Sequence, residues 1–532
     1  MIINSLKQSK ELIKVSVIDI IVLGIIIYIL IYQMVFLKIS DLHIVQRILA
    51  SAIAYLFFKT LAEKEDKRNQ IFDAFIVLGL IEVLFVLAES LKLFSFFPSS
   101  IYLVNGSLGN PNVVAIFLST LIPLSFYKFC SVLRFKCIYI VIILLFVLVI
   151  IFSKCRSAIV FLIFTTVAYA VRCNPKWNLK RLMFSGMIIV GFMLAFVLVN
   201  THKKDSNTSR VLIWKVSLDM IKDKPVTGFG FTNFEKEYNL YQSNYLKKKE
   251  RTQEEVYTSG YIRQPYNEFI YYWLTGGLIY LILYLILFGM SGYIMVISFV
   301  KDCSLLRFTS SVVLVGIFLI SAFSYTFYLV IIEFFLYAHL GILSAFTSPI
   351  KTVNLNKSTL FFFLMIPILV FGNQSIKEMK SDYQISNSIF NKTTPLSKTL
   401  QTFKTYDRFN KENPQFLFNY ALSLMKSKQF EEAIKKLNTA KKYSSYYQIY
   451  YVCGICYELT GKTDEAEQEY LYSSALYPSK YQPQYALFKL YQRLNMPQKA
   501  KAIAQKIDQM PTRVNSKEVN IIRSEIKKYL SQ

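Results

Sequence analysis

The sequence predicts an all-α protein, in which a polytopic membrane domain of about eleven helices precedes a helical-repeat domain. Of the 532 residues, 54% are hydrophobic and 18% are charged, whereas soluble domains carry about 25% charged residues. Apolar runs of roughly 17–25 residues recur with charges mainly between them, which is typical of membrane-spanning helices. After about residue 400 these runs stop, and small residues recur about every 33 positions instead.

The apolar runs alternate with basic connections, as the positive-inside rule requires. Lys7, Lys10 and Lys14 precede the first run and place the N-terminus in the cytoplasm. No small-residue cleavage site follows that run, so it is expected to stay as a helix. The first five spans are expected at about residues 15–37, 42–62, 71–93, 112–128 and 137–153. The sixth ends near Arg172, and the seventh is expected at about 182–200. The last four are expected at about 269–300, 308–327, 328–348 and 358–372.

Residues 202–265 form a polar segment that is too long for a simple turn and that this topology places outside the cytoplasm. The short eleventh span puts the rest of the chain on the same outer side. We therefore predict a membrane domain over 1–373 with the outer loop 202–265, a linker over 374–399 and a repeat domain over 400–532. The protein is expected in the bacterial inner membrane with a periplasmic C-terminal domain.

The repeat shows in small and bulky residues at matching positions. One copy carries Ala421, Leu424, Ala433, Leu437 and Ala440, and the next carries Gly454, Tyr457, Ala466, Tyr470 and Ser473. A looser third copy has Ala486 and Ala500, and Pro478 lies where such a repeat ends. Small residues let paired helices approach closely, and the pattern resembles that of tetratricopeptide repeats. An unrelated helical-hairpin domain is the alternative.

Charge and cysteine usage exclude other classes. The net charge of +26 suggests nucleic acid at first, but Lys and Arg gather in the short connections, where they set membrane topology. Cys453 and Cys456 form a C-x-x-C pair on a predicted repeat helix. Packing is favoured there over redox or metal chemistry.

Two arginines, Arg156 and Arg210, are predicted on the outer side of the membrane, where the positive-inside rule disfavours them. Arginine presents a planar fork of donors that matches phosphate oxygens and stays protonated. Snorkelling or an interfacial ion pair is the alternative explanation. No D-x-D metal signature is apparent in the outer loops.

Four motifs follow one another along the chain. They are G-S-L-G-N-P-N at 106–112, S-K-C-R-S at 153–157, R-V-L-I-W at 210–214 with K-P-V-T-G-F-G at 224–230, and R-Q-P-Y-N-E at 263–268 before a glycine-containing span. This order resembles the O-antigen ligase and polymerase family of membrane glycosyltransferases over about residues 70–345. Members of that family with a repeat tail also resemble the C-terminal arrangement.

The resemblance implies a metal-independent transfer on the periplasmic side, with no cofactor. The donor would be an oligosaccharide on a polyprenyl diphosphate, and the acceptor a hydroxyl of a glycan, lipid or protein. By motif position Arg156 and Arg210 correspond to the two diphosphate-binding arginines of the family, and Arg263 and Asn267 are further candidates for binding the donor.

One position departs from the family pattern, because Tyr266 stands where the ligases carry a catalytic histidine. The chain has 3 histidines, and tyrosine is a poor base at neutral pH because its reference pKa is about 10. Glu268 is our candidate base, and an ordinary interfacial carboxylate is the equally weighted alternative. Tyr266 is expected to stack on sugar or to donate a hydrogen bond.

We therefore predict a membrane glycosyltransferase in which Glu268, Tyr266 and Arg210 serve catalysis, and whose repeats recruit a protein partner or the acceptor. Alternatives are a protein O-oligosaccharyltransferase of the same fold and a non-catalytic scaffold whose repeats bind protein. A transporter of polyprenyl-linked glycans is a further alternative, although the internal duplication expected of one is not seen.

Overall fold

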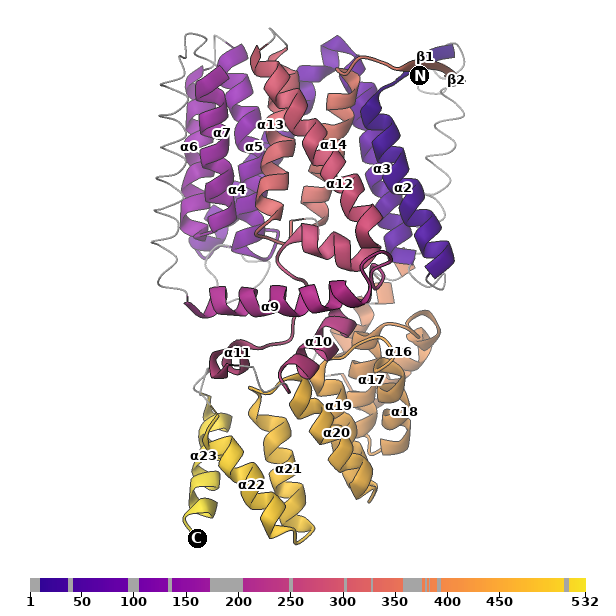
Figure 1. The fold of residues 1–532 in the computed structure, drawn as a ribbon, viewed down its shortest axis with the longest axis vertical. Coiled ribbons are helices and arrows are strands. Elements are labelled where there is room, and N and C mark those ends of the chain that lie inside the picture. The colour runs from indigo at the N-terminus through magenta and orange to yellow at the C-terminus, as the bar shows by residue number, and fades with distance from the viewer. Residues whose placement is uncertain are drawn as a thin grey trace. The chain divides into compact units, whose positions relative to one another are not determined.

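The computed structural model describes residues 10–36, 42–93, 105–132, 136–172, 204–247, 252–300, 304–326, 329–356, 376–377, 380–381, 383–389, 394–510 and 516–532. The chain divides into two compact units (Figure 1). The first unit comprises Met1–His202 and Tyr266–Ile368, and the second comprises Lys203–Pro265 and Leu369–Gln532. The outer loop predicted from the sequence thus shares a unit with the C-terminal helices.

Helices occupy nine of the predicted spans in the described part of the first unit. They are α2 (Val17–Phe36), α3 (Leu42–Glu63), α4 (Glu65–Ser90), α5 (Pro111–Ser131), α6 (Lys136–Ser153), α7 (Arg156–Arg172), α12 (Glu268–Val300), α13 (Leu305–Ser321) and α14 (Val330–Ala345). In five of them, α3, α4, α5, α6 and α12, the described residues are long and apolar enough to cross a membrane. The predicted spans at 182–200 and 358–372 lie outside the described residues.

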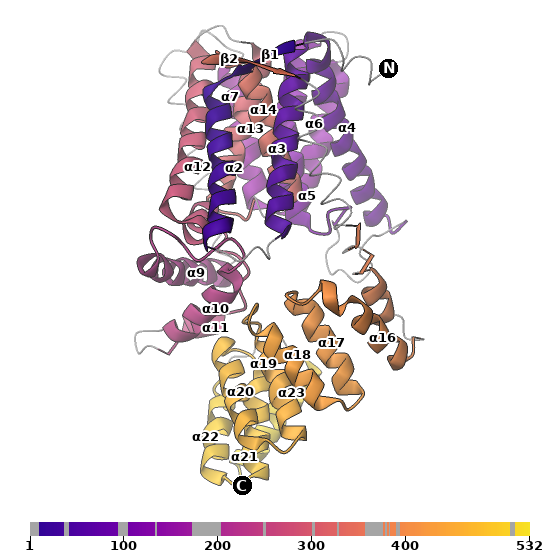
Figure 2. The same ribbon diagram turned by 90° about the vertical axis from the view of Figure 1, so that its right-hand side faces the viewer.

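The bundle has an interior and a periphery (Figures 1 and 2). Within α5, 83% of the most apolar window is buried, whereas in α6 the share is 22%. Apolar surface left uncovered by protein is what lipid solvates, so α6 is a peripheral helix. Helices α3 and α14 approach each other closely at Gly341 of α14. A Cβ at this position would lie 2.2 Å from the Tyr55 carbonyl oxygen of α3.

A two-stranded antiparallel sheet is the feature that the all-α prediction missed. Strand β1 (Lys10–Val15) pairs with β2 (Lys351–Asn356), and Leu12 lies opposite Asn354. Strand β1 immediately precedes α2, and β2 follows α14, so the sheet joins the two ends of the first unit. Alternation in K-E-L-I-K-V is too short to identify a strand when its partner is more than 300 residues away.

The second unit is helical in the part of the chain that the structure describes. Its helices are α9 (Lys204–Asp223), α10 (Phe234–Tyr245), α11 (Gln253–Thr258), α16 (Leu396–Tyr406), α17 (Pro414–Lys426), α18 (Phe430–Ala440), α19 (Tyr447–Leu459), α20 (Thr463–Leu476), α21 (Tyr481–Arg493), α22 (Pro497–Asp508) and α23 (Lys517–Leu530), with a 3-10 turn, η2, at Asp407–Phe409. Between α17 and α22 consecutive helices pack in pairs (Figure 2).

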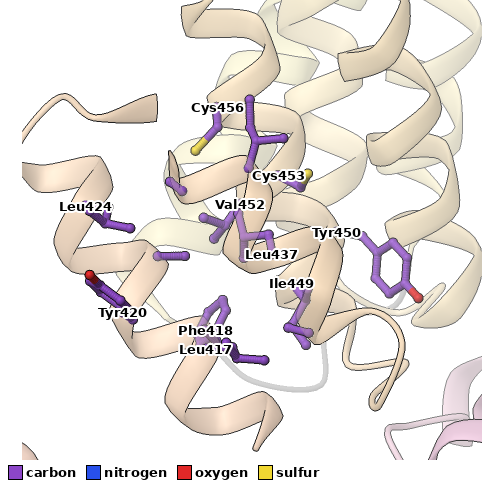
Figure 3. Packing of buried hydrophobic residues seen from close by; sticks show 14 of the residues in the cluster. Leu417, Phe418, Tyr420, Leu424, Leu437, Ile449, Tyr450, Val452, Cys453 and Cys456 are labelled. Atoms are coloured by element: carbon purple, nitrogen blue, oxygen red, sulfur yellow. The ribbon is translucent and has the colours of Figure 1, made fainter. Parts of the chain in front are cut away.

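The recurring small residues lie where these helices touch. Ala421, Ala433, Ala440 and Ala466 are fully buried, and a Cβ on Gly454 would lie 2.5 Å from the ring of Tyr470. Around them the apolar side chains of α17, α18 and α19 form one core (Figure 3). Close helix packing thus explains the spacing of these residues. That the domain belongs to the tetratricopeptide class stays a prediction.

Replacing Gly341 by Ala tests the α3–α14 crossing. The new methyl group would overlap a backbone carbonyl, which cannot rotate away, and such overpacking costs about 1–3 kcal/mol. We expect the thermal unfolding midpoint of the purified protein in detergent to fall by several degrees. Gly289→Ala is the matched control, because a Cβ there meets nothing within 4 Å. Equal midpoints for the two variants would contradict the close crossing.

Candidate functional site

The G-S-L-G-N-P-N loop is held by two carboxylates of α4. Glu89 accepts hydrogen bonds from the Asn105 backbone N (2.7 Å) and side chain (3.1 Å) and from the Gly106 backbone N (2.9 Å). Glu82 accepts from the backbone N of Ser107 (3.1 Å) and from its hydroxyl. The two glutamates are two turns apart on α4, so one face of a predicted span holds the start of the loop.

The glycine and asparagine of this motif have structural roles. Gly106 has a φ of +54°, and a Cβ there would lie 2.1 Å from Glu82 Oε1. Asn110 caps α5, since its side chain accepts from the Asn112 backbone N at 2.8 Å, and Pro111 occupies the first helical position. Proline is favoured there because its fixed φ suits the helix and its missing N–H is not needed.

The turn between α6 and α7 places Arg156. Lys154 has a φ of +53°, and the Cys155 backbone N donates to Ser153 Oγ at 3.3 Å. The Cys155 thiol lies 3.8 Å from the Asn112 carbonyl oxygen, so this turn meets the start of α5. Two predicted motifs, 106–112 and 153–157, therefore lie together, and half-buried Arg156 begins α7 beside them.

The Tyr266-Asn267-Glu268 segment opens α12. Tyr266 has a φ of +55°, and its ring packs edge-on against Tyr325 with 5.5 Å between ring centroids. Asn267 caps the helix, because its side chain accepts from the Ile270 backbone N at 3.1 Å. Glu268, the first helical residue, is only 3% exposed. The helix bends soon afterwards at Gly277, whose φ of +73° is not helical.

In the second unit, α9 carries Arg210 and Trp214 one turn apart, and Arg210 is half-buried. The indole Nε1 of Trp214 donates to the Pro265 carbonyl oxygen at 3.0 Å. This bond joins the arginine–tryptophan motif to the proline of the R-Q-P-Y-N-E motif. Arg263 is exposed two residues before Pro265.

The K-P-V-T-G-F-G stretch turns the chain from α9 to α10. Gly228 and Gly230 have φ values of +67° and +99°, and the Gly228 backbone N donates to the Lys224 carbonyl oxygen at 3.1 Å. The Lys224 ammonium lies 4.7 Å from the centre of the Phe229 ring. Both glycines adopt conformations that other residues rarely populate, which explains their presence in the motif.

The predicted site residues are divided between the two units. Arg156 lies in the first unit with Tyr266, Asn267 and Glu268, and the motif contact between Cys155 and Asn112 belongs to that unit. Arg210 and Arg263 belong to the second unit. The convergence of Arg156 and Arg210 on one cavity stays a prediction.

Sequence reasoning missed three carboxylates with structural roles. Glu82 and Glu89 on α4 hold the loop before α5, and Glu333 of α14 forms an ion pair with Arg47 of α3. Charged residues inside a predicted span are rare and expensive, so their presence was a usable signal. These carboxylates give irregular backbone and a basic side chain the partners that lipid cannot supply.

The C-x-x-C pair in the repeats is buried and free of disulfide bonding. Burial raises the pKa of Cys453 to about 12 and that of Cys456 to about 11. Thiols with such pKa values stay protonated at neutral pH and are poor nucleophiles. This favours the packing role predicted from the sequence.

Residues 140–285 match the family model described as O-antigen ligase. The matched stretch includes Arg156, Arg210 and the 263–268 motif, and it ends within α12. No curated protein matches the chain. The match supports a membrane glycosyltransferase-type ligase at the level of the family.

The short helix α11 offers a test by pH. Burial alone would raise the pKa of Glu255, but hydrogen bonds from the Lys215 ammonium (2.7 Å), the Thr252 backbone N (2.9 Å) and Tyr245 lower it below its ordinary value. A lowered pKa in the folded state means that the carboxylate stabilises the fold above its ordinary pKa of about 4.5. That stabilisation is lost as the pH falls through the folded-state pKa.

We expect the unfolding midpoint of Glu255→Gln to lie below that of the wild type at pH 7, with the difference shrinking as the pH falls below 4.5. The measurement is thermal unfolding of the purified protein across a pH series. Glu254→Gln, on the exposed side of α11, should stay close to the wild type throughout. A difference that grows toward acid pH would contradict this account.

Proposed function

We propose that the chain is a membrane glycosyltransferase that transfers an oligosaccharide from a polyprenyl diphosphate to an acceptor hydroxyl on the periplasmic side. The observation that carries the proposal is the O-antigen ligase match over 140–285. The match covers the sequence motifs that hold Arg156, Arg210 and Arg263. The acceptor hydroxyl belongs to a glycan, a lipid or a protein.

In the proposed reaction the acceptor oxygen attacks the anomeric carbon of the donor sugar. The bond from that carbon to the diphosphate oxygen breaks, and polyprenyl diphosphate leaves with both electrons of the bond. Guanidinium groups of Arg156, Arg210 and Arg263 neutralise the diphosphate and the charge that develops on it as it leaves. This role suits arginine, which keeps its charge when it is partly buried.

The proton of the acceptor hydroxyl passes to the carboxylate of Glu268. This residue stands at the first position of α12, and it is shielded from water. Its neighbour Asn267 holds the helix start by capping it, and an amide at that position can also donate to a phosphate oxygen. The Tyr266 ring packs on Tyr325, which supports a shaping role for Tyr266 in the sugar site.

The periplasmic placement of the C-terminal domain rests on counting crossings. Residues 203–265 and the C-terminal helices form one compact unit, which supports placing them on the same side of the membrane. Three described apolar helices, α12, α13 and α14, separate them along the chain. If each of the three crosses the membrane, a fourth crossing is needed after β2, where the sequence predicts its eleventh span.

The paired helices α17–α22 would then form a tetratricopeptide-like domain over about residues 400–532 in the periplasm. Such stacked pairs provide a surface for a protein partner or for the acceptor.

Substitutions in the proposed site should lower glycan transfer without lowering the amount of protein in the membrane. We expect Arg156→Ala and Arg210→Ala to lower glycan transfer by about 100-fold or more, the magnitude typical of a lost charge-stabilising donor. Glu268→Gln should abolish transfer, and Tyr266→Phe should retain measurable activity. The measurement is the amount of transferred surface glycan in a deletion strain that carries each variant, normalised to the protein in the membrane.

Lys222→Ala is the matched control for Arg210→Ala, because Lys222 lies on the same helix with its side chain 75% exposed. It should transfer normally. Normal transfer by Glu268→Gln would show that the base lies elsewhere, and normal transfer by both arginine variants would favour the scaffold alternative.

Reporter fusions test the placement of the C-terminal domain. Alkaline phosphatase fused after Gln532 should be active, because that enzyme folds only outside the cytoplasm. The same reporter fused after Asn356 should be inactive, since β2 pairs with the strand that precedes α2 at the cytoplasmic end. If the fusion after Gln532 is inactive and a cytoplasmic reporter at the same site is active, the predicted eleventh span and the periplasmic placement are wrong.

A further inference from the structure

The seven residues before Tyr266 are held along almost their whole length by hydrogen bonds. We call Ser259–Pro265 the lead-in segment, because α12 begins three residues after it. Within the lead-in segment, the carbonyl oxygens of Ser259, Gly260, Ile262 and Pro265 accept from Ser479 (3.3 Å), Gln242 (2.9 Å), Asn239 (3.0 Å) and Trp214 (3.0 Å).

Two side-chain amides of α10 form hydrogen bonds with the backbone of the lead-in segment, as a neighbouring strand would in a sheet. Asn239 donates to the Ile262 carbonyl oxygen and accepts from the Ile262 backbone N, both at 3.0 Å. Gln242, one turn later, reaches Gly260. Both amide side chains are fully buried. Moving the lead-in segment away would leave them without hydrogen-bond partners, which would destabilise the fold. The lead-in segment is therefore tied to α10.

The C-terminal helices supply the other half of this arrangement. Tyr261 donates through its hydroxyl to Glu235 of α10, shares a hydrogen bond of 3.2 Å with Ser444 Oγ, and packs edge-on against Tyr446 with 4.9 Å between ring centroids. Ser445 Oγ donates to the Glu235 carbonyl oxygen at 3.3 Å. We call these contacts, together with the Ser479–Ser259 bond, the docking interface.

Apolar packing accompanies the hydrogen bonds of the docking interface. Leu240 of α10 packs against the apolar core that α17, α18 and α19 share, and α10 contacts α20 (Figure 1). Ser444 and Ser445 are 5% and 1% exposed. A Cβ on Gly260 would lie 3.4 Å from the Tyr477 hydroxyl. The docking interface therefore combines partly buried hydrogen bonds with apolar packing.

We propose that the C-terminal helical domain is a positioning element of the transfer site, because its docking on α10 fixes the lead-in segment and with it Arg263 and the entry to α12. The proposal rests on the proposed function. Tyr261 acts as a positioning residue through the lead-in segment, and it touches neither donor nor acceptor. The loops before α19 and before α21 thus serve the chain's own outer segment, which leaves the remaining repeat surface for a partner.

The first arm of the test detects docking without any reference to activity. Ser259→Cys with Ser479→Cys places two thiols where a side chain now bonds the neighbouring backbone at 3.3 Å. Mild oxidation of the full-length protein in membranes should link them in most molecules, seen as a disulfide by mass spectrometry. The two single variants are the controls. Failure of the pair to link would overturn docking in the membrane-embedded protein.

The second arm measures coupling to transfer. Tyr261→Ala removes the ring and hydroxyl from the docking interface, and we expect the turnover number per folded molecule to fall by about 10-fold to 100-fold, the effect of misplacing a site by about 1 Å. The probe is the polyprenyl-diphosphate-linked glycan extracted from the host, supplied to protein in liposomes. Tyr383→Ala is the matched control, because Tyr383 is 71% exposed in the same unit.

The third arm separates positioning from loss of folded protein. Tyr261→Ala is combined with the cysteine pair, and turnover is compared before and after oxidation. Covalent re-docking should restore at least half of the wild-type rate, and reduction should abolish that gain, which a merely misfolded protein would not show. Full activity of reduced Tyr261→Ala, or no gain on linking, would overturn the positioning role.

Failure of the proposed function gives a different result. In that case the wild-type protein transfers no glycan in liposomes, although the cysteine pair still links. Positioning alone fails when the wild type transfers glycan and the undocked variants transfer it equally well.

Discussion

Much of this structure depends on one constraint: every backbone N–H and C=O that leaves a helix or strand needs another partner. Water is scarce inside the bundle and at the buried interfaces, so side chains take over this role. Glu82 and Glu89 do so for the loop before α5. Asn239, Gln242 and Trp214 do so for the lead-in segment. These side chains give the two irregular segments the hydrogen-bond partners that a helix or sheet would otherwise supply.

This constraint changes how the motifs are interpreted. Asn110 and Asn267 cap helices, and Gly106 allows the loop to approach Glu82. These residues are needed to build the site whether or not they touch a substrate. The proposed chemistry rests instead on Arg156, Arg210 and Glu268, because guanidinium groups can neutralise a diphosphate and a carboxylate can accept a proton.

The second unit links the two halves of the chain's extramembrane sequence. A loop between spans and a repeat tail are often treated as separate modules, but here α10 contributes Leu240 to the core of the repeats. The C-terminal helices therefore pack directly against the segment that precedes α12.

The sequence by itself determined most of the described helices. Hydropathy is a local property, so nine predicted spans coincide with helices among the described residues. The spacing of Ala421, Ala433 and Gly454 followed from close helix packing, which leaves a local trace. Arg156, Tyr266 and Glu268 were identified from the motifs, and their roles in transfer stay a prediction.

Tertiary structure alone decided which distant segments meet. The pairing of β1 with β2, the support of the 106–112 loop by α4, and the docking of Tyr261 on Ser444 and Tyr446 join residues that are far apart in sequence. Such contacts depend on the shapes of two surfaces and on which buried polar groups remain to be satisfied. Neither quantity is periodic along the chain, so a single sequence carries no pattern from which to read them.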